Sequence, residues 1–155
     1  MSKNLPEISD ELVIRKVIGR TNYLVSTGAI GTKFLSEIRD NKKIFGIKCP
    51  SCSKVYIPPK THCPACFAKM TEWVELSGKG SLTSYTIVYY KEPYMVKEPP
   101  FAYGVIQMDG ADTGWVHFLG QVDLDKIKIG MRLEPVFKTE REGSILDIDH
   151  FKPSS

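Results

Sequence analysis

At 155 residues, the chain is long enough for one ordinary domain or for two very small domains that share a surface. Its hydrophobic content of 42% and charged content of 25% are typical of soluble globular proteins. No apolar run approaches the roughly 20 residues that a membrane helix needs, and residues 1–7 lack the apolar core of a signal peptide. We therefore expect a cytoplasmic protein with no membrane partner.

The charge is distributed unevenly along the chain. Residues 33–79 contain nine basic and four acidic side chains, a net charge of +5, whereas residues 80–155 contain eight basic and eleven acidic side chains, a net charge of −3. Proteins that bind nucleic acid usually present a basic face to the phosphates. The C-terminal half offers no such face in bulk, so nucleic acid is not an expected partner.

Residues 1–43 are predicted to form a helical N-terminal segment. The apolar side chains of residues 10–18 fit either a short helix or a strand. Thr32 is a suitable N-cap for a helix that ends at Asn41. Phe34, Leu35 and Ile38 would then share one apolar face of that helix.

All four cysteines lie within 18 residues, with Cys49 and Cys52 in one C-x-x-C pair and Cys63 and Cys66 in another. Each pair places two thiolates on one tight turn, and two pairs complete a tetrahedron around a single metal ion. The spacing predicts a structural zinc site in a ribbon of residues 44–74. Four cysteine ligands leave no open position for the water that a catalytic zinc carries.

Spacing alone leaves other interpretations of the cysteines open. Two disulfides would use the same residues, although a cytoplasmic location disfavours them. A redox C-x-x-C motif does not need a second copy, and a rubredoxin-type iron site would have the same four ligands. His62 lies beside Cys63, but the cysteines suffice without it.

Apolar residues recur with the spacing of strands on both sides of the second cysteine pair. Regular strand spacing with one intervening helical turn is typical of a five-stranded, partly open barrel of the OB type. We therefore predict a mainly β fold, in which the helical segment and a rubredoxin-like zinc ribbon precede an OB-fold domain of residues 75–155. The strands are expected at 44–47, 55–57, 73–76, 82–90, 101–108, 115–119, 132–137 and 145–151, with the helical turn within 123–129.

Known catalytic motifs are missing from the sequence. It has no Gly-rich phosphate loop followed by lysine, no G-x-S-x-G and no His-Glu-x-x-His. His117 is expected on a strand, as a hydrogen-bonded histidine of the core or its rim. Alternation would place Asp147 and Asp149 on one face of the last strand and His150 on the other. We predict no catalytic residues, because a nucleophile, a base and an oxyanion donor cannot be assembled.

Aromatic residues concentrate around the expected strands 82–90, 101–108 and 115–119. Such side chains fill the core of a barrel by default, but some can line a groove or a subunit interface. The loop 91–100 contains three prolines and is the loop best suited to a function, since it is long and stiffened. The aromatic residues are Tyr89, Tyr90, Tyr94, Phe101, Tyr103 and Trp115.

A series of short motifs occurs in a characteristic order between about residues 23 and 153. The motifs are Gly28-Ala29 with Thr32-Lys33-Phe34-Leu35, Gly46-Ile47-Lys48-Cys49-Pro50, Val55-Tyr56-Ile57-Pro58-Pro59, Trp73, Gly80-Ser81-Leu82-Thr83-Ser84-Tyr85-Thr86, Ile127-Lys128-Ile129-Gly130-Met131 and Phe151-Lys152-Pro153. This series resembles the zinc-ribbon/OB-fold proteins that accompany thiolases and related acyl-CoA enzymes, a family of the domain-of-unknown-function type found in archaea and actinobacteria. Many members have Phe-Trp where this chain has Phe34-Leu35, and residues 1–22 match no motif.

The resemblance implies an accessory role in lipid metabolism. Family members are non-catalytic subunits beside a thiolase-like enzyme, or beside a hydratase in sterol side-chain breakdown, and are proposed to bind acyl-CoA. In archaeal relatives the protein bridges acetoacetyl-CoA thiolase and hydroxymethylglutaryl-CoA synthase. We therefore expect a scaffold that binds acyl-CoA and partners a thiolase-like or other acyl-CoA enzyme. The alternative is a nucleic-acid-binding module, since zinc ribbons and OB barrels also occur in proteins that bind RNA or DNA.

The residues suggest where a coenzyme A thioester could bind. The basic segment 33–79 would attract its phosphates, and the apolar helix face, with barrel aromatics opposite, would line a slot for the pantetheine and acyl chain. The same helix face could instead serve only to hold the helix against the ribbon. The expected ligand-binding residues are Phe34, Leu35, Ile38, Lys42, Tyr89, Tyr94, Phe101 and Trp115.

Overall fold

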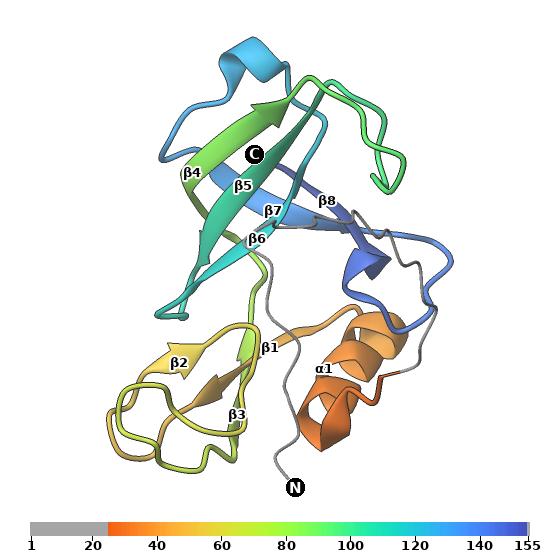
Figure 1. The fold of residues 1–155 in the computed structure, drawn as a ribbon. Helices are drawn as coiled ribbons and strands as arrows, with labels where there is room; N and C mark the ends of the chain where they lie inside the picture. The colour runs from red at the N-terminus through yellow and green to blue at the C-terminus, as the bar shows by residue number, and fades with distance from the viewer. Residues whose placement is uncertain (1–24, 155) are drawn as a thin grey trace, which may run out of the picture.

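The computed structural model describes residues 25–154, which form one α-helix, a three-stranded sheet and a closed five-stranded barrel. The barrel lies above, and the helix and the small sheet lie side by side below it (Figure 1). The element predicted within residues 10–18 lies outside the described residues. In chain order the elements are α1 (Gly28–Asn41), β1 (Ile44–Lys48), β2 (Val55–Tyr56), β3 (Glu72–Leu76), β4 (Gly80–Val88), β5 (Phe101–Met108), β6 (Gly114–Leu119), the 3-10 turn η1 (Leu124–Lys126), β7 (Arg132–Phe137), the 3-10 turn η2 (Ile145–Asp147) and β8 (Ile148–Pro153).

Helix α1 begins at Gly28 with Thr27 as its N-cap, so the predicted start at Thr32 is wrong. Gly28 and Gly31, in the first turns of α1, have low helix propensity, and for this reason the sequence pattern indicated a later helix start. Tertiary packing supports the extra turn, because Ile30 packs against the ribbon core. Further along, Phe34 and Ile38 are buried, and the Phe34 ring lies 5.8 Å from the ring of Trp115 in the barrel. The helix therefore fills the space between ribbon and barrel.

The ribbon is an antiparallel sheet in the order β2-β1-β3. Gly46 lies where β1 and β2 are closest, since a Cβ there would be 2.8 Å from Cγ1 of Val55. Strand β3 pairs with β1 as far as Leu76, opposite Ile44. The predicted domain boundary between residues 74 and 75 thus falls inside a ribbon strand.

The barrel has the strand order β4-β5-β6-β8-β7 and is closed by pairing of β7 with β4. Strands β6 and β8 run parallel, with Leu119 opposite Phe151, and the other neighbours are antiparallel. This arrangement confirms the predicted five-stranded OB-type barrel, including the helical turn η1 between β6 and β7, but the barrel is closed and not partly open as expected. The side chains buried most completely in its interior are Leu82, Ile106, Met108, Leu133, Ile148 and Phe151.

Strand β4 has the predicted length of nine residues but begins and ends two residues earlier than the predicted strand 82–90. Its pairing with β5 shifts register between Leu82 and Ser84, a bulge that interrupts the expected alternation. Leu82 consequently packs in the central core, whereas Val88 belongs to a separate apolar cluster. The strand ends at Val88, so Tyr89 and Tyr90 lie in the loop that follows it.

The predicted strand 145–151 is divided into the turn η2 and strand β8. A capping box forms the turn: the Ser144 hydroxyl accepts from the amide of Leu146, and the Asp147 carboxylate accepts from the amide of Ser144. The same carboxylate accepts from the amides of Glu142 and Gly143. These local hydrogen bonds compete with strand pairing, so β8 begins only at Ile148.

Ribbon, helix and barrel form one unit, because their buried side chains belong to one continuous cluster. The outer edge of β2 is paired by the turn between β5 and β6 rather than by a strand. Val55 donates its amide to Oδ2 of Asp112 and accepts from the Asp112 amide, both at 2.8 Å. The Thr113 hydroxyl accepts from the Ile57 amide at 2.8 Å and donates to the Ile57 carbonyl at 2.9 Å. Among residues 25–154, no helix is long and apolar enough to cross a membrane.

Candidate metal centre and ligand pocket

The four cysteine sulfurs lie within 4.8 Å of one another at the end of the ribbon. Sγ of Cys49 is 3.4 Å from Sγ of Cys66, and Sγ of Cys52 is 3.6 Å from Sγ of Cys63. A tetrahedron with Zn–S bonds of about 2.3 Å has edges of about 3.8 Å. The residues therefore fit one structural zinc ion.

Two turns of the same geometry present the sulfurs. The carbonyl of Cys49 accepts from the amide of Ser53 at 3.0 Å, and the carbonyl of Cys63 accepts from the amide of Phe67 at 2.9 Å. The amide of each first cysteine donates to the carbonyl five residues further on, at 2.9 Å in both turns. Ser53 and Phe67, the residues after the second cysteine of each pair, both have φ of +59°. The ribbon thus repeats one knuckle around a local two-fold arrangement.

The Tyr56 hydroxyl supports the site from the sheet. It lies 3.2 Å from Sγ of Cys63, and its hydrogen bond, with the amides of Cys66 and Ala65, lowers the pKa of the Cys63 thiol to about 6. The same contact raises the pKa of Tyr56, which stays protonated and donates. Thiolates are the form that binds metal, so this contact favours metal binding at neutral pH. His62 is not part of the cysteine cluster and forms an isolated bridge with Lys69.

The residues predicted to bind a ligand do not form one site. Phe34, Ile38 and Trp115 are buried in the central core, where they pack helix against barrel. Phe101 is buried in the separate cluster with Val88 and Phe118. These positions favour the packing interpretation of the helix face.

The other predicted ligand residues are accessible but far apart in the fold. Leu35 is half-buried and lines a shallow hollow with Arg39 and Gly143. Lys42 is exposed and ends α1 in a left-handed conformation, with its amide donating to the carbonyl of Glu37. Tyr89 and Tyr94 are exposed in the loop after β4. As a ligand-binding set, these residues stay a prediction.

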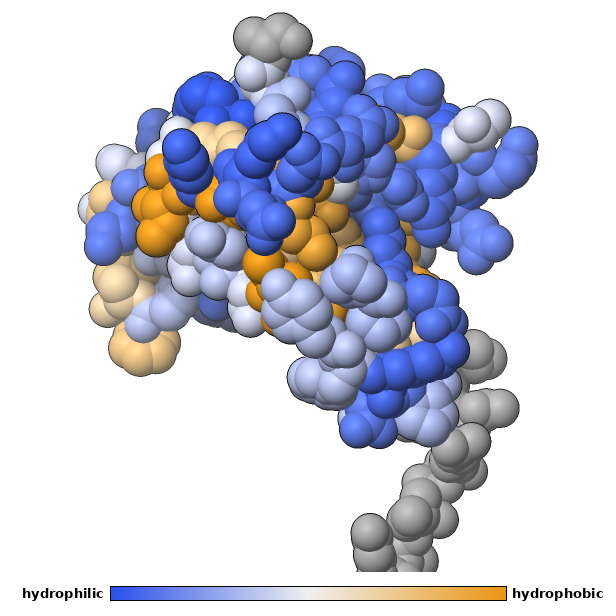
Figure 2. Space-filling model, turned by 90° about the horizontal axis from the view of Figure 1, so that it is seen from above, coloured by the Kyte–Doolittle hydropathy of each residue, from blue (hydrophilic) through white to orange (hydrophobic). Residues whose placement is uncertain are grey.

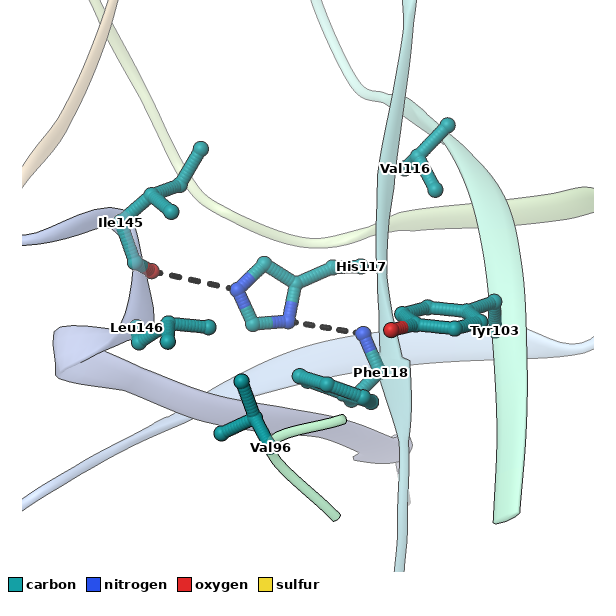
Figure 3. Close-up of a pocket in the computed structure, with 7 residues that line it drawn as sticks. All are labelled: Val96, Tyr103, Val116, His117, Phe118, Ile145 and Leu146. Atoms are coloured by element: carbon teal, nitrogen blue, oxygen red, sulfur yellow. Dashed lines mark hydrogen bonds between the residues drawn. The ribbon is translucent and has the colours of Figure 1, made fainter. Parts of the chain in front are cut away.

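An apolar pocket of about 160 Å³ opens on the outer face of β5 and β6 (Figure 3). The sequence did not predict it, because its walls come from the loop before β5, from both strands and from η2. The nearest signal was Val116, an apolar residue at an outward position of β6 that is 58% exposed. The lining residues are Val96, Tyr103, Val116, His117, Phe118, Ile145 and Leu146.

His117 forms the inner wall of this pocket and has no free ring nitrogen. Nε2 lies 3.2 Å from the carbonyl of Ile145, and Nδ1 accepts from the amide of Phe118 at 2.9 Å (Figure 3). Burial and the nearby charge of Lys97 lower the pKa of His117, so it is neutral at pH 7. This confirms the predicted hydrogen-bonded core histidine, which cannot serve as a general base in this arrangement.

The separation of Asp149 from His150 that alternation predicted is wrong. Nδ1 of His150 lies 2.6 Å from Oδ2 of Asp149, because the ladder shifts register between Val136 and Phe137 and breaks the alternation in β8. Nε2 of His150 is buried and has no hydrogen-bond partner among the described residues. It lies against Gly120, where a Cβ would be 3.1 Å away. A substrate therefore cannot reach this nitrogen, and the pair is not a catalytic dyad.

Large apolar side chains are exposed over a short stretch of the loop between β4 and β5. Tyr89 is 71% exposed and Tyr94 79% exposed, and Tyr90 and Val96 are exposed as well. This loop borders the pocket through Val96. Seen from above, the barrel end shows apolar surface bordered by hydrophilic side chains (Figure 2). Loop and pocket together form a continuous apolar region of the barrel surface.

Comparison with known proteins gives matches along most of the chain. Residues 37–71 match the family model of the rubredoxin-like zinc ribbon domain of ChsH2, and residues 73–138 match its C-terminal OB-fold domain. A DUF35 domain-containing scaffold protein of Methanocaldococcus jannaschii is 28% identical over 110 residues, which are 68% of this chain and 75% of the relative. A protein of the same description from Pyrococcus furiosus is 26% identical over 126 residues, 79% of this chain and 91% of the relative.

Solved structures share the fold. The Ltp2-ChsH2(DUF35) aldolase aligns with a TM-score of 0.61 at 23% identity, covering 91% of this chain and 100% of that chain. A DUF35-family protein of unknown function from Sulfolobus solfataricus aligns with a TM-score of 0.62 at 22% identity, covering 83% of this chain and 87% of that chain. The arrangement of helix, ribbon and barrel is thus common to these proteins.

Proposed function

The chain belongs to the ChsH2-type family of zinc-ribbon and OB-fold proteins, and from this we propose that it is a non-catalytic scaffold subunit. In this proposal it binds an acyl-CoA-processing enzyme of the thiolase type and a coenzyme A thioester. Two relatives are described as scaffold proteins, and the Ltp2-ChsH2 structure is described as an aldolase. These descriptions support a subunit that works beside an enzyme.

The observation that carries the proposal is the exposed aromatic loop between β4 and β5. Three tyrosines and one valine within eight residues leave large apolar surfaces in water. Tyrosine is enriched at the centres of protein interfaces, where its ring is buried and its hydroxyl finds a partner. A proline-rich loop also loses little conformational freedom on binding. The loop is therefore suited to anchor a partner protein.

A non-catalytic role is supported by the chemistry of the candidate groups. Within residues 25–154, the cysteines are gathered at one metal site, and neither buried histidine has an accessible ring nitrogen. Four cysteine ligands close the coordination of a zinc ion, so the metal has no position for a reacting water. The chain then contributes binding surfaces, and the partner carries the reaction.

The partner can be tested by affinity purification of the tagged chain from its native cells at moderate salt, with mass spectrometry of the retained proteins. We expect near-stoichiometric recovery of an acyl-CoA-processing enzyme. The double variant Tyr89→Ala/Tyr94→Ala should lower recovery about tenfold or more, as loss of interface anchors does. Tyr85→Ala, an exposed tyrosine on β4 outside the loop, is the matched control. Recovery of nucleic acid or ribosomal proteins instead would contradict the proposal.

The acyl-CoA part of the proposal is supported by the apolar pocket on the outer face of β5 and β6. An apolar cavity of about 150 Å³ can hold a benzene molecule, so this pocket has room for a short acyl group. Calorimetric titration with hexanoyl-CoA and with coenzyme A should show tighter binding of the thioester. Val116→Asp should remove that difference, whereas Ile129→Asp, at an exposed position outside the pocket, should not. Equal binding of both ligands to the unmodified chain would refute an acyl site.

The nucleic-acid hypothesis receives less support from the barrel surface. OB-folds bind nucleic acid on the face of their second and third strands, here β5 and β6. Single-stranded nucleic acids are bound by stacking aromatics beside lysines and arginines. The exposed side chains around the pocket on this face are the aliphatic Val96, Val116 and Ile145, whereas Phe118 is buried and the Tyr103 ring stacks on it. These exposed aliphatic side chains are better suited to an acyl group or to an apolar side chain of a protein.

A further inference from the structure

Phe67 combines two features that are unfavourable for an isolated protein. Its side chain is 78% exposed, and its backbone has φ of +59°, in the left-handed region. That region is disfavoured for side chains with a Cβ and is unusual for a bulky residue. Glycine would occupy this position without strain and without exposing apolar surface. Neither folding nor solubility therefore explains a phenylalanine here.

The metal knuckle imposes this conformation. The Phe67 amide donates to the carbonyl of Cys63 at 2.9 Å, and the next residue, Ala68, accepts from the Cys63 amide. Ser53 has the same φ in the other knuckle and carries a small polar side chain. The exposed neighbours of Phe67 in its knuckle include Pro64 and Ala65, so the tip is apolar. The two knuckles thus share a backbone and differ in the side chain that they present.

The surface around the knuckles is positively charged. Residues 42–71 contain six lysines and no aspartate or glutamate. Lys43 and Lys48 form ion pairs with Glu75 and Glu72 of β3. The other four are exposed and form no ion pair among residues 25–154: Lys54, Lys60 and Lys69 lie in or next to the knuckles, and Lys42 lies at the end of α1. A partner that meets this surface is expected to be acidic.

We propose that Phe67 anchors the ribbon on the partner enzyme by entering an apolar pocket whose rim carries carboxylates. The inference rests on the proposed scaffold function and names the surface that would serve it. Insertion would bury a ring now in water, and the rigid knuckle would present that ring without further ordering. Lys54, Lys60 and Lys69 would steer the encounter and face the acidic rim. The ribbon lies at the opposite end of the molecule from the tyrosine loop, so each surface can be altered separately (Figure 1).

The matched knuckles allow a sharp test. Phe67→Gly and Ser53→Gly are each compared with the unmodified chain for melting temperature, zinc content and binding to the thiolase-type enzyme recovered with that chain. Both variants should keep or raise the melting temperature, because glycine adopts left-handed φ without strain. Phe67→Gly alone should weaken binding about tenfold or more. Association of the unmodified chain with the partner enzyme should also slow as salt rises from low to physiological concentration.

The possible outcomes separate this inference from the scaffold function. If Phe67→Gly binds the enzyme as tightly as the unmodified chain, the anchor is overturned and the scaffold function stands. If Phe67→Gly loses binding of coenzyme A but not of the enzyme, the ring stacks on a nucleotide and the inference is also overturned. If the unmodified chain recovers no such enzyme, the scaffold function fails. The role of Phe67 as an anchor is then tested by photo-cross-linking from a benzophenone-bearing residue placed at position 67 or at position 53. If position 67 gives no more cross-linked protein than position 53, the anchor is refuted.

Discussion

The ribbon and the barrel are stabilised by different means within one chain. In the ribbon the fully buried side chains are few, Ile44, Ile47 and Met70 together with two of the cysteines, and the metal must supply much of the stability. The barrel buries large aliphatic and aromatic side chains from all five strands and from Ile127, just after η1. Small units that cannot build a sufficient core commonly depend on a metal. The difference teaches that loss of the metal and loss of core packing should damage different parts of the molecule.

The largest expected effect comes from the metal site. Cys49→Ser should abolish zinc binding, because it removes one of the four thiolate ligands. The ribbon should then unfold, since structural zinc contributes about 10–16 kcal/mol to the folding of small zinc domains. Hydrogen exchange measured by mass spectrometry should show loss of protection in β1, β2 and β3, while β5 and β6 stay protected. Ser53→Ala, in the same knuckle but not a ligand, should retain zinc. Equal loss of protection in the barrel would contradict the division into two regions.

A core substitution should produce the converse pattern. Phe151 has no exposed surface and lies opposite Leu119 of the neighbouring parallel strand β6. Phe151→Ala should lower the free energy of unfolding by about 3–5 kcal/mol, measured with urea, because it leaves a cavity. Zinc content should remain at one ion per chain if the ribbon survives. Tyr85→Ala on the outside of β4 is the control and should change stability little.

Acid should destabilise the chain through Asp147. Burial raises the pKa of this carboxyl, but hydrogen bonds from the amides of Glu142, Gly143 and Ser144 outweigh burial and lower the pKa. The folded pKa is therefore below the unfolded value, so the stabilisation is present above about pH 4 and is lost as pH falls toward the folded pKa.

The change that tests this is Asp147→Asn. It should cost about 1–3 kcal/mol at neutral pH and flatten the acid limb of stability against pH. Asp125→Asn, in the exposed part of η1, is the control. An unchanged acid limb would show that other carboxylates carry the pH dependence.

The smallest effect concerns the seam that joins the two regions. The Thr113 hydroxyl makes two hydrogen bonds with the backbone of Ile57. Thr113→Val keeps the shape but leaves both backbone groups without this partner, which should cost about 1–2 kcal/mol. The measurement is whether zinc removal by a chelator becomes faster, as it should if the seam protects β2. Thr86→Val, at an exposed position, should leave the chelation rate unchanged.

Features with short-range sequence signals were predicted well. The spacing of Cys49, Cys52, Cys63 and Cys66 determines one metal site, because each pair needs only a local turn. Alternation predicted the barrel strands, and the order of motifs predicted the family, which the domain matches confirm. Both signals depend on residues close together in the chain, so they survive without knowledge of tertiary contacts.

Features that depend on tertiary contacts were missed or misplaced. The bulge after Leu82 turns the second half of β4 over, and the capping box at Ser144 shortens β8. Both shift the faces on which side chains lie, as any change of register does. The pocket beside Val116 joins four separate segments, so no single stretch of sequence encodes it. Phe34, Ile38 and Trp115 are buried in the central core, which favours a packing role, and their part in a ligand slot stays a prediction.

The chain carries one tryptophan in each region, which has a practical consequence. Trp73 lies in β3 beside Phe45, with Nζ of Lys33 4.6 Å from its ring centroid. Trp115 is enclosed between helix and barrel, with Phe34 and Phe151 as neighbours. If one of the two tryptophans is replaced by phenylalanine, the indole fluorescence of the remaining one should report on its own region alone. Emission from Trp73 would follow the arrival or loss of zinc, while emission from Trp115 would follow the docking of α1.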